Sequence, residues 1–169
     1  MNEAVKVLTH EHETIKRAIN QTNVLFADIL NGNKDIKAMH ERIDFFRKYA
    51  DGYHHHKEEE VLFPEMIKRN EMLEYGVIHE MLQNHEDFRE MLAEIETLVN
   101  EGNATLALSK FKAYSEALLE HIAVEDEEVF QIAETLLSED ELLTVLYRFE
   151  DCDRELGVDA KKDWEDTIE

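Results

Sequence analysis

The sequence has few of the residues that break helices or cross-link small folds. Its 169 residues include one proline, five glycines and one cysteine, Cys152. A single cysteine excludes an internal disulfide framework and a thiolate-rich metal site, and it favours a reducing compartment. Because proline and glycine are scarce, the few breaks in the chain stand out.

Basic residues are also scarce. Eighteen lysine and arginine residues stand against forty aspartate and glutamate residues, which gives a net charge of -22. Such a charge repels nucleic acid and anionic lipid and favours cations. No stretch approaches about eighteen apolar residues, and the charged N-terminus has no apolar signal core. The sequence therefore predicts a soluble cytoplasmic protein with no nucleic-acid or membrane partner.

The pattern of breaks predicts a helical bundle. By length, residues 1–169 form one domain. Four long apolar-periodic segments and a shorter fifth are separated by four breaks, at residues 31–33, 75–76, 101–103 and 137–138. No segment alternates as a strand does. Because the connections are short, we expect an all-α, up-down-up-down four-helix bundle over about 2–136, with a short C-terminal fifth helix and tail over about 138–169.

Local signals indicate where the helices begin and bend. Asn33 and Asn103 are expected N-caps, and Ser138 with Glu141 is expected to form a capping box for the last helix. Pro64 lies inside the second segment. That helix is therefore expected to kink, or to end its regular hydrogen bonding one turn earlier.

Two short motifs each occur twice. One is His-Glu-x-φ-basic-x-x-φ, where φ is apolar, and it begins at His12 and at His85. The other is His-x-x-x-Glu followed by an apolar residue and phenylalanine, and it occurs at residues 54–63 and 121–130. Four residues make about one helical turn, so this duplication is what a two-fold metal site inside a helical bundle needs.

Counting about 100° per residue around each helix indicates which of these side chains face inward. Each long helix directs one histidine toward its apolar stripe, and two also direct a glutamate there. The six inward candidates are His12, His54, Glu58, His85, His121 and Glu125. His55 lies on the flank of its stripe and is a candidate for an additional ligand. Four other histidines are expected at the surface: His10, His40, His56 and His79.

These inward residues predict metal binding. A buried carboxylate costs several kcal/mol unless it is paired or binds metal, and the core stripe supplies no lysine or arginine for Glu58 and Glu125. Salt bridges from the helix flanks stay open as an alternative. Imidazole and carboxylate without thiolate suit iron, manganese or zinc, and six protein ligands are too many for one tetrahedral zinc. Two metals are expected, with iron as the first choice.

The same residues resemble the hemerythrin-like, or HHE cation-binding, domains. Residues 54–64 match that family's His-x-x-Lys-Glu-Glu-x-x-Leu-Phe-Pro signature at every specified position. Residues 121–130 resemble its second signature, with Gln131 where proline is usual. The segments around His85 and His12 resemble the motifs of helices 3 and 1, and together the four motifs cover the chain from about residue 5 to about residue 150.

The resemblance implies an oxo- or hydroxo-bridged non-heme di-iron centre. Its terminal ligands would be four histidines and its bridging ligands two glutamates: His12, His54, His85, His121, Glu58 and Glu125. Family members often have a fifth histidine, but Met81 stands one turn before His85 here. His55 could substitute for it, or one metal keeps an extra open position.

Three kinds of function stay open, and whether the protein is an enzyme is not decided. Reversible dioxygen binding or storage needs a dry apolar pocket, which could be lined by Phe46, Phe88, Phe111, Tyr114 and Met81. The second function is a stress response to nitric oxide or peroxide, or repair of iron–sulfur proteins. The third is a metal-dependent sensor, or a bundle that binds a protein partner through the acidic residues 139–169 without catalysis.

Overall fold

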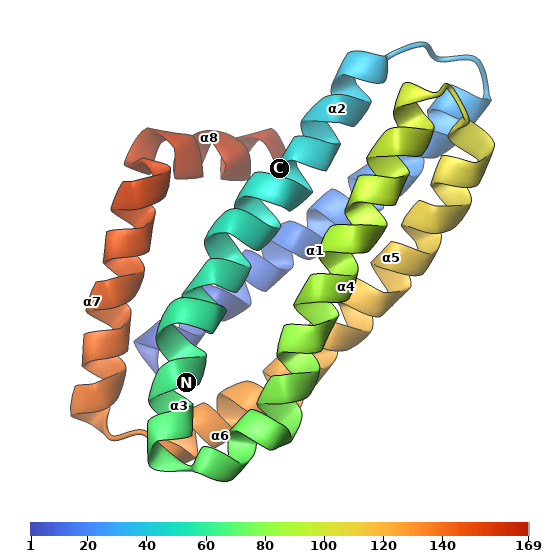
Figure 1. Ribbon diagram of the computed structural model, residues 1–169. Helices are drawn as coiled ribbons and strands as arrows, with labels where there is room; N and C mark the ends of the chain where they lie inside the picture. Colours follow the sequence, from blue (N-terminus) through green and yellow to red (C-terminus); the bar gives the residue numbers. More distant parts are fainter. Residues whose placement is uncertain (169) are drawn as a thin grey trace.

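A computed structural model describes residues 1–168; Glu169, at the end of the expected C-terminal tail, lies outside the described residues. These residues are almost entirely helical and contain no strand. Four long helical rods run alternately up and down the molecule (Figure 1). The predicted all-α antiparallel bundle is confirmed.

The first rod is regular and the second is not. The first is α1 (Glu3–Leu30). The second begins as α2 (Ile36–Phe45), passes into a π-helix, η1 (Phe46–His55), then into a second π turn, η2 (Glu58–Leu62), and ends as α3 (Phe63–Arg69). π-Helices are rare and frequently occur at functional sites, so this rod is the first structural indication of where a site lies.

The third and fourth rods complete the bundle. A short 3₁₀ turn, η3 (Glu71–Tyr75), leads into the third rod, α4 (Val77–Asn100). The fourth rod consists of α5 (Ala104–Val124), a π turn η4 (Glu125–Val129) and α6 (Phe130–Leu136). In the fourth rod, as in the second, a π turn therefore interrupts the helix.

The two π turns η2 and η4 are equivalent. Each begins at the glutamate of a His-x-x-x-Glu motif, and each is closed by the N–H of a phenylalanine five residues later. Phe63 donates to the carbonyl of Glu58, and Phe130 donates to the carbonyl of Glu125. The duplicated sequence motif thus builds a duplicated turn.

Pro64 lies at the start of α3, directly after η2, so the expected change of hydrogen bonding one turn before the proline is confirmed. The proline is not its cause, because the same turn forms in the fourth rod, where Gln131 keeps its N–H. Proline removes the usual donor for the carbonyl of Glu60. That carbonyl instead accepts a hydrogen bond of 3.1 Å from Arg148 Nη2.

The predicted helix caps are confirmed except for one. Asn103 caps α5, and Ser138 with Glu141 forms the capping box. The prediction for Asn33 is wrong, because Asp35 caps α2. Asn33 instead accepts a hydrogen bond from the backbone N–H of Asp35, a local turn with which short polar side chains compete against helix formation.

The C-terminal segment consists of two helices. α7 (Glu139–Leu156) ends at Gly157, whose φ of 99° is accessible to glycine at little cost, and α8 (Val158–Ile168) leaves in another direction (Figure 1). Both helices contact α1, and α7 also contacts η1 and η2. We call α7 and α8 together the C-terminal arm. Within the described part of the chain, no helix combines the length and apolarity needed to cross a bilayer.

Candidate metal centre

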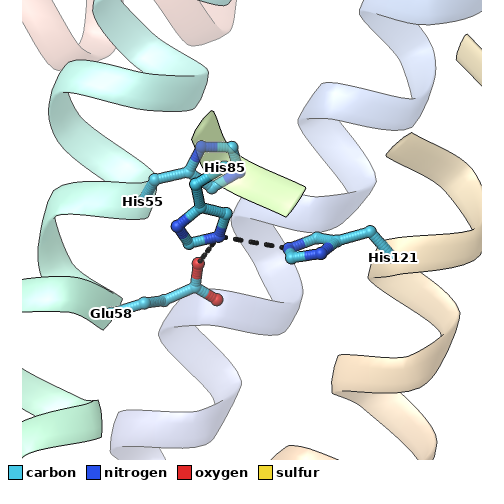
Figure 2. Close-up of side chains that lie close together, drawn as sticks. All are labelled: His55, Glu58, His85 and His121. Carbon is cyan, nitrogen blue, oxygen red and sulfur yellow. Dashed lines mark hydrogen bonds and ion pairs between the residues drawn. The ribbon is translucent and has the colours of Figure 1, made fainter. Parts of the chain in front are cut away.

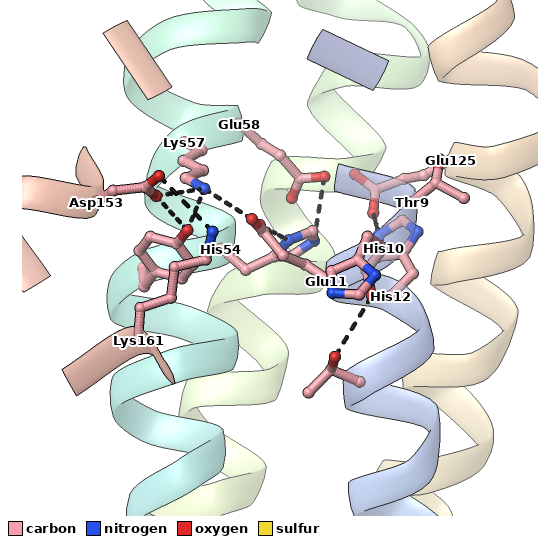
Figure 3. A network of polar contacts seen from close by, with 12 residues as sticks. Thr9, His10, Glu11, His12, His54, Lys57, Glu58, Glu125, Asp153 and Lys161 are labelled. Atoms are coloured by element: carbon pink, nitrogen blue, oxygen red, sulfur yellow. Dashed lines mark hydrogen bonds and ion pairs between the residues drawn. The ribbon is translucent and has the colours of Figure 1, made fainter. Parts of the chain in front are cut away.

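The six predicted ligand residues meet inside the bundle, and each is at most 2 % exposed. Together with His55 they form two groups of four, in which the potential ligand atoms lie within 4.8 Å of one another. The first cluster contains His55, Glu58, His85 and His121 (Figure 2). The second cluster contains His12, His54, Glu58 and Glu125 (Figure 3).

Two carboxylates lie between the clusters. Glu58 Oε1 is 3.4 Å from His85 Nε2, and Glu58 Oε2 is 3.6 Å from His54 Nε2. Glu125 Oε1 is 3.3 Å from His12 Nε2 and 3.1 Å from His121 Nε2. Each carboxylate therefore faces histidines of both clusters, which is the position of a carboxylate that bridges two cations in a helical bundle.

His55 reaches the first cluster because η1 is a π-helix. Its i→i+5 hydrogen bonds make a wider turn than an α-helix, so consecutive residues diverge less and both His54 and His55 point inward. The His55 ring stacks on the His85 ring, with centroids 3.8 Å apart and planes 15° apart. The structure thus places a fifth histidine beside the centre from the second rod, while Met81 is fully buried in the core.

In every histidine of the two clusters, Nδ1 lies beside an acceptor oxygen. The pairs are His12 with Asp126 at 2.8 Å, His54 with Glu11 at 2.9 Å, His55 with Asp51 at 3.0 Å, His85 with Glu59 at 2.7 Å and His121 with Asn84 at 2.9 Å. When Nδ1–H donates to this oxygen, the lone pair of Nε2 is left to face the cluster. Metal-binding histidines are oriented in this way.

The acceptor oxygens follow the sequence duplication. Glu11 and Asn84 each stand one residue before the histidine of a His-Glu motif. Glu59 and Asp126 each stand one residue after a glutamate that lies between the clusters. Each motif therefore supplies both a potential ligand and the oxygen that orients a histidine on a neighbouring rod.

The atoms that face the clusters have no hydrogen-bond donors. Within residues 1–168, His12 Nε2, His54 Nε2 and all four carboxylate oxygens of Glu58 and Glu125 are buried without a partner. His85 Nε2 and His121 Nε2 lie 3.2 Å apart, and with both Nδ1 atoms protonated neither has a hydrogen to share. Buried acceptors are costly unless donors or cations satisfy them. These nitrogen and oxygen donors therefore fit two cations.

The pKa values of the buried groups also indicate that cations would stabilise the clusters. Burial raises the pKa of Glu58 well above its usual value, and the nearby Glu125 carboxylate raises it further. Burial would lower the pKa of His12, but the carboxylates of Asp126 and Glu125 raise it to about 9. Burial lowers the pKa of His54, which keeps it in the neutral form that binds metal. Cations between these groups would replace the protons on Glu58 and His12.

A buried ion pair supports the second cluster. Lys57 is fully buried, with Nζ 2.7 Å from Glu11 Oε2 and 3.2 Å from Asp153 Oδ1 of α7 (Figure 3). The lysine is buried because the C-terminal arm covers this face of the bundle. Within residues 1–168, Lys57 forms ion pairs with Glu11 and Asp153 and none with Glu58 or Glu125, so neither of these two glutamates is neutralised by this lysine.

The remaining four histidines belong to neither cluster. His10 and His79 are exposed, as expected, and His40 and His56 are half-buried at the edge of the bundle. His10 Nε2 lies 3.2 Å from Glu165 of α8.

Two cavities reach the first cluster from outside. The first, which we call the aromatic cavity, has a volume of about 190 Å³ and borders His55; its other lining residues are Phe46, Arg47, Asp51, Phe88, Arg89, Leu92 and Tyr114. Three of the five residues expected around a ligand pocket line it, but Phe111 and Met81 do not. The second, which we call the acidic cavity, has a volume of about 250 Å³ and borders His121; its carboxylates are Glu80, Asp87 and Glu120.

Comparison with known proteins identifies the fold. The family model described as the hemerythrin HHE cation binding domain matches residues 3–133. The chain belongs to this family, and the resemblance seen in the sequence is confirmed. The match begins with the first rod, ends within α6 of the fourth rod and does not include the C-terminal arm. No curated protein and no solved structure matches the chain.

Proposed function

We propose that this protein holds two iron ions, one at each cluster, and reversibly binds a small diatomic ligand, dioxygen in the first place. His55, His85 and His121 would hold one ion, His12 and His54 the other, with Glu58 and Glu125 between them. The observation that supports this most strongly is the set of buried Nε2 and carboxylate atoms without hydrogen-bond partners. Donors of this kind suit iron, and manganese or zinc are the alternatives.

The aromatic cavity supports a ligand of small size and low polarity. Phe46, Phe88, Leu92 and Tyr114 give it an apolar lining next to His55. Tyr114 is 3 % exposed, and burial raises its pKa, so its hydroxyl stays a neutral donor. An iron pair, when bound, supplies a redox-active centre for such a ligand. The Tyr114 hydroxyl can donate a hydrogen bond to it.

The test begins with protein purified without air and loaded with iron(II). We expect two irons per chain, a visible absorption band that appears on exposure to air, and loss of that band on deoxygenation. Irreversible bleaching, or turnover of peroxide or nitric oxide, would replace reversible binding with the stress-response function. Protein that takes up no metal would overturn the proposal altogether.

A cavity-filling pair of variants tests the ligand pocket separately from the metal. Leu92→Trp should fill the aromatic cavity, keep both irons and slow the appearance of the band. Ile36→Trp, beside a different cavity near the N-terminus of α2, is the matched control and should leave the rate unchanged. Overpacking costs about 1–3 kcal/mol, so thermal unfolding of both variants must be compared. Equal rates in both variants would show that the ligand does not use this cavity.

A further inference from the structure

One guanidinium group orients two histidines of the first cluster. Arg89 Nε lies 2.9 Å from Asp51 Oδ2, and Arg89 Nη2 lies 2.5 Å from Glu59 Oε2. Asp51 accepts from His55 at 3.0 Å, and Glu59 accepts from His85 at 2.7 Å. The two stacked rings of the cluster are therefore held through a single arginine.

Arg89 explains the basic position of the duplicated His-Glu motif. Arg89 stands four residues after His85, and Lys16 stands four residues after His12. Lys16 approaches Asp126, the acceptor of His12, but its Nζ is 3.9 Å from Asp126 Oδ2. The rigid fork of arginine can hold two carboxylates at once, whereas lysine is a flexible point charge. The basic residue of the motif therefore holds two orienting carboxylates at the first cluster, whereas at the second cluster it only approaches one.

In the second cluster, the orientation of His54 depends on a different and more protected cation, Lys57. Glu11 Oε1 lies 2.9 Å from His54 Nδ1, and Glu11 Oε2 lies 2.7 Å from Lys57 Nζ, so Lys57 holds the carboxylate that orients His54. Lys57 is itself 0 % exposed under the C-terminal arm, whereas the Arg89 side chain is 34 % exposed. Water and chelators can therefore reach the Arg89 contacts of the first cluster but not the Glu11–Lys57 contact that orients His54; Asp126, which orients His12, is 25 % exposed.

The cavities make the same distinction. The aromatic cavity borders His55, the acidic cavity borders His121, and neither is lined by His12, His54 or Glu125. The three carboxylates of the acidic cavity would attract a cation toward the first cluster. The second cluster has no such approach from these cavities.

We propose that the first cluster holds the exchangeable metal of the pair, and that Arg89 is the positioning residue that sets how fast this metal leaves. The inference rests on the proposed binding of two metals. The second metal stays in place because the Glu11–Lys57 pair and the C-terminal arm enclose the contacts that orient His54.

The test uses the full chain loaded with zinc(II), a redox-inert probe, and challenged with a chelator. Native mass spectrometry follows the number of metals per chain over time. We expect one metal to leave at least about tenfold faster than the other, because the groups that hydrogen-bond to metal ligands typically change metal affinity by about tenfold or more. Loss of both metals at one rate would overturn this inference alone. A chain that never holds zinc or iron would overturn the proposed function together with it.

Variants at Arg89 test the positioning role. Arg89→Ala should speed release of the first metal by about tenfold or more and leave the second rate unchanged. Arg47→Ala is the matched control, because Arg47 lines the same cavity and holds Glu96 at 2.9 Å, away from both clusters. Arg89→Lys should fall between, since it keeps the charge but not the fork. Equal acceleration of both metals, or the same effect from Arg47→Ala, would show that Arg89 acts only on general stability.

Discussion

The second and fourth rods contain the same His-x-x-x-Glu motif and the same π turn, but different residues surround them. His55 and Lys57 in the second rod correspond to Ile122 and Val124 in the fourth. Only the second rod continues the π-helix upstream of its motif, in η1. The duplicated motif therefore gives both rods the same histidine and glutamate pair. The residues between the histidine and the glutamate differ between the two rods.

The difference at Lys57 follows the charge of the oxygen that orients each motif histidine. His54 is oriented by Glu11, a carboxylate, and Lys57 supplies the cation that a buried carboxylate needs. His121 is oriented by Asn84, which is neutral and needs no cation. Val124 at the matching position can therefore be apolar. The motif histidine of the second rod is thus oriented by a carboxylate with a paired lysine, and that of the fourth rod by a neutral amide.

The largest expected effect comes from the carboxylates between the clusters. Glu58→Ala should remove both metals, because Glu58 belongs to both clusters. Glu125→Ala removes the other carboxylate that faces histidines of both clusters and should also lower the metal content sharply. Elemental analysis of iron-loaded protein measures both, with His56→Ala as a control that keeps two metals. Equal metal content in all three variants would show that these glutamates are not ligands.

The next largest effect is expected on stability at Lys57, and it distinguishes the ionic contact of the second rod from the neutral contact of the fourth. Lys57→Met leaves Glu11 buried without its cation and should lower the free energy of unfolding by about 3–5 kcal/mol. Val124→Met, at the matching position, should change it by less than about 1.5 kcal/mol. Urea unfolding with chelator present measures this without metal.

The double variant Glu11→Asn with Lys57→Val copies the neutral pair Asn84 and Val124. It should recover most of the stability lost in Lys57→Met, because a buried ion pair replaced as a unit is often nearly neutral in stability. A double variant as unstable as Lys57→Met would mean that Lys57 stabilises the bundle through other contacts, such as Asp153.

A smaller effect should come from the flanking histidine. His55→Ala should weaken metal binding at the first cluster by about tenfold or more and leave the second cluster filled. Ile122→Ala, the matching change, should lower stability by about 2–5 kcal/mol through a core cavity without changing the metal count. Metal titration followed by native mass spectrometry distinguishes them. Unchanged affinity in His55→Ala would assign His55 to packing against His85.

The smallest effect is expected at the proline. Pro64→Ala should keep both metals and change the free energy of unfolding by no more than about 1 kcal/mol, since Gln131 accompanies the same turn in the fourth rod. Thermal unfolding and metal analysis measure this. Loss of metal in Pro64→Ala would mean that the two π turns have different causes.

The helices and the six central residues could be predicted because their signals are local. Apolar spacing and few breaks indicate four rods, and a histidine four residues before a glutamate places both on one helical face. His55 could not be assigned in this way, because helical wheels assume α-helical geometry and η1 is a π-helix. Asn33 was misassigned because two neighbouring polar residues competed for one cap.

The sequence alone determines an acidic helical bundle of the hemerythrin HHE family with histidine and glutamate residues at its centre. Packing alone determined which carboxylate orients which imidazole, that Lys57 is enclosed by the C-terminal arm, and that Arg89 holds Asp51 and Glu59. The reason is that these contacts join side chains from different helices. Periodicity along one helix shows which way a side chain faces, but not which partner it will meet.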